Sequence, residues 1–170
     1  AQPPLFKIKR GSAEVYKKDE RALDDFLIDE GLKGSRFLAG PNSGQEGHTG
    51  EDLREIVGRA RIQCNLLKKL AERITAPLAE QAAISGVLSL EVLHDSENVG
   101  SAAEYIAHRL NVLALPGEDG WTGIGSPGEA LSFEHNRRGV VNHYKIDEAL
   151  INSSEARSLN VDAEKLQNMF

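Results

Sequence analysis

The chain has 170 residues, of which 40% are hydrophobic, 27% are charged and only 5% are aromatic, and its net charge is −6 at pH 7. This length suits one domain that buries about two-thirds of its unfolded surface, in a core built mainly from Leu, Ile, Val and Ala. No apolar run approaches the ~18 residues of a membrane span. The single cysteine, Cys64, excludes an internal disulfide and fits a reducing compartment. We therefore expect a cytoplasmic protein with no membrane partner.

Charge is distributed unevenly along the chain. Through Arg21 there are six basic and three acidic residues, a net charge of +3, which leaves −9 for the remainder. Affinity for duplex DNA comes mostly from Lys and Arg side chains that displace counterions from the phosphates. The basic beginning can therefore approach phosphate, whereas the acidic remainder is repelled by it. The residues predicted to lie near DNA are Lys7, Lys9, Arg10 and Lys17.

Residues 5–18 predict a β-hairpin. Phe6 and Ile8 alternate with lysines in the period of two that is typical of a half-buried strand. The two prolines before them exclude a helix and favour entry from a sheet edge. Residues 10–12 offer a turn, and residues 13–16 alternate again. Such a strand indicates the border of a larger domain.

The next segments predict a helix and a loop. Asp19 is a candidate N-cap for a helix that ends near Gly31, with acidic residues on its outer face. Paired carboxylates can hold Mg²⁺, but we expect a solvated helix face. Residues 34–38 suggest a short strand. Residues 39–50 contain five glycines or prolines and predict a flexible loop, in which His48 is exposed.

Residues 49–75 give the strongest helix signal. Apolar residues recur there in alternating steps of four and three, which predicts one face packed in a core. We expect Cys64, on this face, to be a buried small hydrophobic side chain. An open alternative is that the same helix is a docking surface for a partner. The stripe consists of Leu53, Val57, Ala60, Cys64, Leu67, Ala71 and Ile74.

The second half of the chain predicts an α+β fold: a long central helix, several shorter helices and small antiparallel hairpins. Helices are expected over residues 77–87 and from about residue 98 to residue 113, with residues 88–93 ambiguous between helix end and strand. Residues 121–124 suggest a strand, and residues 131–136 and 139–146 a hairpin. Residues 147–170 suggest one or two short helices, with Ser153 and Asp162 as caps.

Two patterns resemble functional motifs. Gly123, Gly125 and Gly128 satisfy G-x-G-x-x-G, but a dinucleotide site requires a strand before the motif and a helix after it. Residues 130–135 predict a strand, so we reject that interpretation. His135 and His143 share one face of the hairpin if Gly139 forms a bulge, and lie on opposite faces if the turn has two residues. Zinc binding there would need further ligands.

The first residues carry a family resemblance. Ala1 to Gly11, followed by Tyr16 to Phe26, closely resembles the B subunits of bacterial DNA gyrase, which are type IIA DNA topoisomerases. The matching stretch follows the acidic metal-binding motif of the family's toprim domain, and Phe6 stands where the family usually has Tyr. Gram-negative members carry a long insertion after this point. The toprim acidic residues and the downstream Gln-Arg-Tyr-Lys-Gly-Leu-Gly-Glu-Met stretch do not occur in this chain.

This resemblance implies a domain organisation. Residues 1–18 would be a toprim-derived hairpin, and residues 19–170 an insertion domain. Within the insertion we expect the loop at 39–50, a helical part at 51–115, and a hairpin with short helices at 121–170.

The resemblance also implies a function. The chain would be a non-catalytic accessory insertion of an enzyme that uses ATP to supercoil DNA negatively, without catalytic, metal or cofactor residues of its own. Mg²⁺ and ATP would bind elsewhere in the parent enzyme, and the partners would be the gyrase A subunit, the rest of the B subunit, and DNA. The rival interpretation is a free-standing helical adaptor that docks through Leu53 to Ile74. A hydrolase using His135 and His143 is a more distant alternative.

Overall fold

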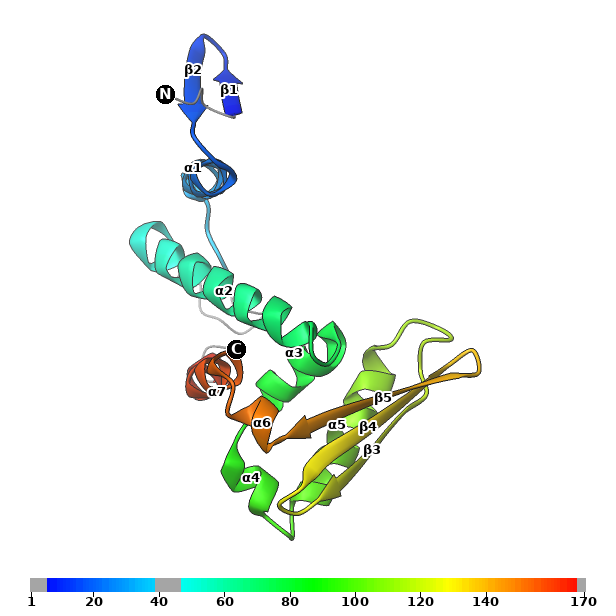
Figure 1. Cartoon of the computed structure of the whole chain (residues 1–170). Helices are drawn as coiled ribbons and strands as arrows, with labels where there is room; N and C mark the ends of the chain where they lie inside the picture. The colour runs from blue at the N-terminus through cyan, green and yellow to red at the C-terminus, as the bar shows by residue number, and fades with distance from the viewer. Residues whose placement is uncertain (1–5, 39–46, 168–170) are drawn as a thin grey trace. The chain divides into compact units, whose positions relative to one another are not determined.

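The computed structural model describes residues 6–38 and 47–167, without the side chains of Arg10 and residues 164–167. The described residues form seven helices and two small antiparallel sheets, which confirms the predicted α+β class (Figure 1). The chain divides into two compact units, Ala1–Ala60 and Arg61–Phe170, here called the first and second units. The predicted domain boundary after residue 18 stays a prediction.

The first unit begins with the predicted hairpin. Strands β1 (Phe6–Arg10) and β2 (Ala13–Lys17) pair antiparallel around a turn in which Gly11 has a φ of +60°. Helix α1 (Glu20–Leu32) follows, and its predicted N-cap is confirmed. The backbone N–H of Ala22 donates to Asp19 Oδ1 over 2.7 Å, which satisfies one of the unpaired amides of the first turn.

Residues 34–38 form less regular structure than predicted. Instead of a strand there is one antiparallel bridge, between Phe37 and His48. His48 is exposed, as predicted. The predicted flexible loop falls largely on residues 39–46, which lie outside the described residues.

Helix α2 (Gly50–Ala71) is confirmed as a long helix of 22 residues, but its apolar face is buried only in part. Leu53 and Leu70 are buried, whereas Ala60 and Cys64 are exposed. The prediction of a buried Cys64 is therefore wrong. Periodicity shows which residues share a face of the helix, but burial requires another element to cover that face.

The second unit starts with the end of α2 and continues through three helices. Its α3 (Ala76–Ser85) has Pro77 in the first turn and ends at Gly86, whose φ is +74°. The ambiguous residues 88–93 form part of a short helix, α4 (Leu90–His94), because Ser89 caps it through the N–H of Glu91. Helix α5 (Val99–Leu113) lies within the range expected for the third helix.

A three-stranded sheet follows, in the order β3-β4-β5. It consists of β3 (Trp121–Ser126), β4 (Ala130–Arg137) and β5 (Val140–Asp147), which confirms the predicted strand and hairpin. Two C-terminal helices complete the unit: α6 (Glu148–Ile151) and α7 (Ser154–Gln167). Ser153 caps α7 through the N–H of Ala156. Asp162 lies inside α7, so its predicted role as a cap is wrong.

One face of the sheet packs on α5, and the core lies between them and the surrounding helices (Figure 1). Because residues directly opposite in an antiparallel sheet share a face, the pairing places Leu131 beside Ile146 on the covered face. The end of α2 and helices α3, α4, α6 and α7 contribute the rest of the core. The largest fully buried side chains are Phe133, Leu70, Leu78, Leu88, Leu93, Ile106, Leu131, Ile146 and Val99.

Helix α5 and the sheet approach each other closely at two glycines of β3. A Cβ atom at Gly125 would lie 2.2 Å from the carbonyl oxygen of Val99, and one at Gly123 would lie 2.4 Å from that of Ala103. No side chain fits at such distances, so the α5 backbone rests directly on the strand. This contact explains the first two glycines of the G-x-G-x-x-G pattern, Gly123 and Gly125, in packing terms.

Candidate functional site

The hairpin β1–β2 carries the residues predicted to lie near DNA, and the strand pairing distributes them over two faces. Lys7 stands opposite Tyr16 and Lys9 opposite Glu14, so these two lysines share one face. Lys17 stands opposite Phe6, on the other face. The side chain of Arg10, at the end of β1, lies outside the described part of the structure. Lys7 and Lys9 therefore do not form one continuous patch with Lys17 on the hairpin.

Two of these cations already have neighbours. Lys7 Nζ lies 2.9 Å from Glu14 Oε2 and 5.7 Å from the centre of the Tyr16 ring. Lys17 Nζ lies 4.7 Å above the ring of Phe26. The Lys7 pair is exposed, and such pairs contribute little to stability. Lys7 can therefore exchange its carboxylate partner for a phosphate at small cost.

The acidic residues of α1 are engaged by basic side chains. Arg54 Nη1 donates to Asp29 Oδ1 over 2.7 Å, and Lys33 pairs with Glu30. These contacts match the expected solvated face more closely than a cation site. Among the described residues there is no group of three or more His, Cys, Asp or Glu side chains placed to hold a metal ion.

The turn of the second hairpin, between β4 and β5, shows which of the two predicted arrangements of His135 and His143 is present. Arg137 pairs with Val140, so the turn consists of Arg138 and Gly139 alone, with φ of 52° and 84°. This is the two-residue turn in which both residues have positive φ. His135 and His143 consequently lie on opposite faces of the sheet, and they cannot share a zinc ion.

His135 has a structural role in the second unit. Its ring stacks on Trp121 with centroids 4.1 Å apart and planes inclined by 7°, and Tyr144 lies on the same indole at 5.6 Å. His135 Nε2 donates to the Glu118 carbonyl oxygen over 2.9 Å, while Arg137 pairs with the Glu118 carboxylate. The stacked His135 ring and the two contacts to Glu118 hold the turn before β3 against the sheet. His143, on the outer face, lies 3.3 Å from Glu134 Oε1.

Two other titratable side chains have structural partners. His94 Nδ1 donates to the Leu90 carbonyl oxygen over 2.7 Å, within its own short helix. Hydrogen bonds from the Asn98 side chain and from the backbone N–H groups of Glu97 and Asn98 lower the pKa of Asp95. These contacts stabilise the entry to α5 and supply no acid–base pair.

The glycine pattern is confirmed as unsuited to a dinucleotide. Gly123 and Gly125 lie inside β3, and the residue after Gly128 leads into β4. A pyrophosphate site needs a helix N-terminus at that point, and a strand is there instead. The two strand glycines instead permit the close contact with α5.

Only the C-terminal part of the predicted docking stripe, at the end of α2 and just after it, packs into the core of the second unit. Ile74, just after α2, is 3% exposed, and Leu67 and Ala71 pack against the buried cluster, as do their neighbours Leu66 and Leu70. A surface made by these residues is not available to a partner in this structure. This finding weighs against the adaptor interpretation over that part of the stripe. No helix among the described residues is long and apolar enough to cross a membrane.

Comparisons with known proteins give the family. No protein-family model matches the chain. A DNA gyrase B subunit of Caulobacter vibrioides is 37% identical over 172 aligned residues, which cover 100% of the chain and 20% of that protein. Proteins of the same name from Rickettsia prowazekii and Campylobacter jejuni are 30% and 33% identical, over 54% and 43% of the chain and 11% and 8% of their own lengths.

All three relatives are thus components of a bacterial DNA gyrase. The resemblance seen in the first residues is confirmed along the whole chain. The chain is homologous to a segment of the B subunit of DNA gyrase. The chain spans about a fifth of the length of the two Caulobacter relatives, at 20% of each.

Proposed function

We propose that the chain is a non-catalytic accessory insertion of a DNA gyrase B subunit, interrupting its toprim domain. The similarity to this type of protein across 100% of the chain supports the assignment. In this proposal the parent enzyme uses ATP and Mg²⁺, held by residues of its other segments, to introduce negative supercoils in the cytoplasm. The insertion helps to organise DNA engagement and communication between domains. Its partners are the gyrase A subunit, the rest of the B subunit, and, through the parent enzyme, DNA.

The second unit acts through protein contact and shape in this proposal. Residues 61–170 contain ten basic and fifteen acidic residues, a net charge of −5. A body with this charge is repelled by a duplex, because binding to the DNA backbone depends on an excess of cations. Such a body can brace neighbouring domains or keep DNA out of a wrong path.

The hairpin β1–β2 is the part that approaches DNA. Lys7 and Lys9 lie on one exposed face, and the pair between Lys7 and Glu14 is solvent-accessible. Lys17 belongs to the other face, and a contact of Arg10 with DNA stays a prediction. We propose that one face at a time contacts phosphate, since a strand ribbon cannot present both faces to the same groove wall.

The test uses the parent gyrase, reconstituted from both subunits, with Lys7→Gln and Lys9→Gln combined. Each lost phosphate contact lowers the slope of log affinity against log salt by about 0.9, so this variant should weaken DNA binding and reduce the slope by up to about 2. The matched control combines Lys68→Gln and Lys69→Gln, two exposed lysines of α2. It should leave DNA binding and supercoiling unchanged. Equal losses in the two variants would contradict a role for the hairpin.

A second measurement examines the acidic body. The 170-residue chain is titrated with duplex DNA at physiological salt, where ordinary non-specific binding has a Kd of about 10⁻⁴ to 10⁻⁶ M. We expect binding in that range or weaker. Sub-micromolar affinity would refute the view that the body works by protein contact.

A further inference from the structure

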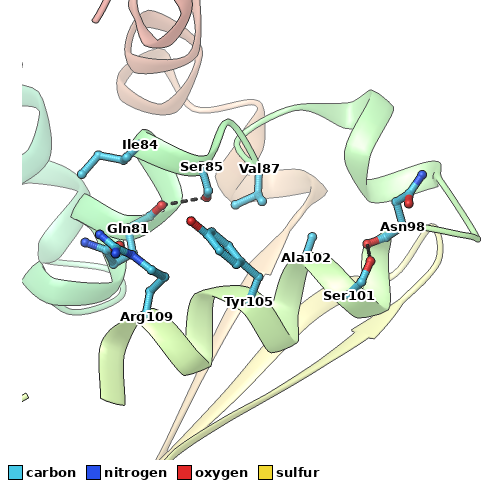
Figure 2. Close-up of a pocket in the computed structure, with 9 residues that line it drawn as sticks. All are labelled: Gln81, Ile84, Ser85, Val87, Asn98, Ser101, Ala102, Tyr105 and Arg109. Carbon is cyan, nitrogen blue, oxygen red and sulfur yellow. Dashed lines mark hydrogen bonds between the residues drawn. The ribbon is translucent and has the colours of Figure 1, made fainter. Parts of the chain in front are cut away.

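An open groove with a volume of about 600 Å³ lies between α3 and α5 of the second unit (Figure 2). It belongs neither to the hairpin nor to the aromatic stack. Its α3 side presents Gln81, Ile84 and Ser85, and its α5 side presents Ala102, Tyr105 and Arg109.

The groove has apolar walls that remain on the surface. Ile84 and Tyr105 are each 56% exposed, although the opposite side of α5 is buried in the core through Ile106 and Leu110. Tyr105 and Arg109 are four residues apart and therefore lie together on the outer side of the helix. Tyr and Arg are among the residue types most enriched at the energetic centres of protein interfaces.

The floor of the groove contains an unusual polar group. Gln81 is 8% exposed and is the one buried polar or charged residue among those described. The bond from Ser85 reaches its backbone oxygen. No buried side-chain nitrogen or oxygen among the described residues lacks a hydrogen-bond partner, so a Gln81 amide atom without one is open to solvent in the groove. Figure 2 shows the Gln81 amide, the Tyr105 hydroxyl and the Arg109 guanidinium gathered at one end of the groove. Each of these three groups can donate a hydrogen bond to an acceptor that enters this end of the groove.

The charge of the groove differs from that of its unit. Arg109 is the only charged residue that lines it, and it forms no ion pair among the described residues. The unit as a whole carries a net charge of −5. A half-buried guanidinium without a carboxylate, beside a donor amide, selects an anionic and planar acceptor.

We propose that this groove docks a protein segment that presents a carboxylate next to an aliphatic side chain. The carboxylate pairs with Arg109 and Gln81, and the aliphatic group packs between Ile84 and the Tyr105 ring. A protein partner fits better than a small molecule, since small-molecule sites enclose most of the ligand and these walls are exposed. The inference rests on the protein-contact function proposed above and names the chemistry of the contact.

The test measures fluorescence anisotropy of a labelled peptide of about 15 residues, long enough to form a helix. The probe is built from Ala, Leu and Glu, with Leu and Glu four residues apart on one face, and a matched peptide has Gln at each Glu position. We expect the Glu peptide to bind the chain about tenfold more tightly than the Gln peptide, the gain of one charged hydrogen bond. Binding too weak to detect at millimolar peptide, or equal binding of both peptides, would overturn the proposal.

Variants of the chain test whether the peptide binds in the groove. Arg109→Gln should bring the ratio between the two peptides close to one, and Tyr105→Ala should weaken both peptides while keeping the ratio. Arg138→Gln removes the same charge at the exposed turn between β4 and β5 and should change nothing. If Arg138→Gln lowers the ratio as much as Arg109→Gln does, the groove is not the site. The assay involves neither DNA nor supercoiling, so its failure is distinguishable from failure of the hairpin test.

Discussion

The two units of the chain are stabilised in different ways. Among the described residues of the first unit, only Leu53 is a buried hydrophobic side chain, whereas the second unit holds a continuous cluster that includes Phe133, Leu70 and Ile106. The first unit is built from local interactions, such as the Asp19 cap and the pairing of β1 with β2. The similarity to gyrase B subunits extends over 100% of the chain, whereas the continuous cluster of buried hydrophobic residues lies in the second unit.

The largest expected effect distinguishes the second unit, which has a core, from the first. Phe133 is 1% exposed, so Phe133→Ala should lower the free energy of unfolding of the second unit by about 3–5 kcal/mol. Phe26→Ala, at a half-buried ring of the first unit, should cost about 1 kcal/mol or less. Trp121 is the only tryptophan and lies in the second unit, so its fluorescence during urea unfolding reports that unit. If both variants shift the unfolding transition measured by Trp121 fluorescence to a similar extent, the two units are not stabilised in different ways.

The same contrast should hold along α2. Leu70 is 1% exposed and Ile62 is 61% exposed. We expect Leu70→Ala to cost about 2–5 kcal/mol and Ile62→Ala to stay within about 0.5 kcal/mol. Leu67→Ala should fall between them, because Leu67 packs against the core but is only partly buried. Chemical denaturation of the three variants tests this order, and a large loss for Ile62→Ala would mean that the middle of the helix is covered.

The contact between α5 and β3 should be sensitive to a single methyl group. Gly125→Ala places a Cβ 2.2 Å from the Val99 carbonyl oxygen, and the resulting displacement should cost about 1–3 kcal/mol. Gly100→Ala lies across the same contact, where an added Cβ meets nothing within 4 Å. This control should be neutral or stabilise the helix by up to about 1 kcal/mol. Equal stabilities of the two variants, measured by thermal unfolding, would contradict the packing described.

A smaller effect is expected in the first unit. Asp19→Ala removes the acceptor of the Ala22 N–H and should destabilise α1 by about 0.5–2 kcal/mol. Hydrogen exchange of the α1 amides should accelerate, while exchange in α5 should not change. Faster exchange in both helices would show that the two units unfold as one.

The smallest expected effect is a loss of stability at low pH, through protonation of Asp95. Hydrogen bonds from Asn98 and Glu97 favour the charged form of Asp95 and place its pKa below the usual ~3.9. Its contribution is therefore complete above about pH 4 and is lost as the pH falls through the lowered pKa. A carboxyl ¹³C NMR titration should give a midpoint below that of an ordinary aspartate. A midpoint at or above ~3.9 would contradict the capping geometry.

Local signals predicted the elements well. Alternation indicated the hairpin β1–β2, a turn signal indicated the hairpin β4–β5, and the Asp19 cap indicated the start of α1, because these features depend on residues close in sequence. The exposure of Cys64 was missed, since the stripe on α2 defines a face without showing what covers it. Asp162 was assigned as a cap because a residue type that favours caps also occurs inside helices.

The candidate sites depended more on tertiary structure. The separation of His135 from His143 followed from the length of one turn, which the sequence left open between two forms. The groove beside Arg109 combines α3 and α5, and only the spacing of Tyr105 and Arg109 on α5 hinted at it. No local pattern identifies Gln81 as a buried amide, because its burial depends on how two helices pack.

Asn111 of α5 forms hydrogen bonds with the backbone at the unpaired edge of β3. Its side-chain amide bonds both backbone groups of Trp121, with Oδ1 accepting from the N–H and Nδ2 donating to the carbonyl oxygen, each over 2.8 Å. It thereby occupies the positions that a fourth strand would use there. Strand β3 carries no charged residue to discourage such an addition. Helix α5 therefore blocks the addition of a further strand at this point. It prevents the uncharged edge strand β3 from pairing with strands of other chains there.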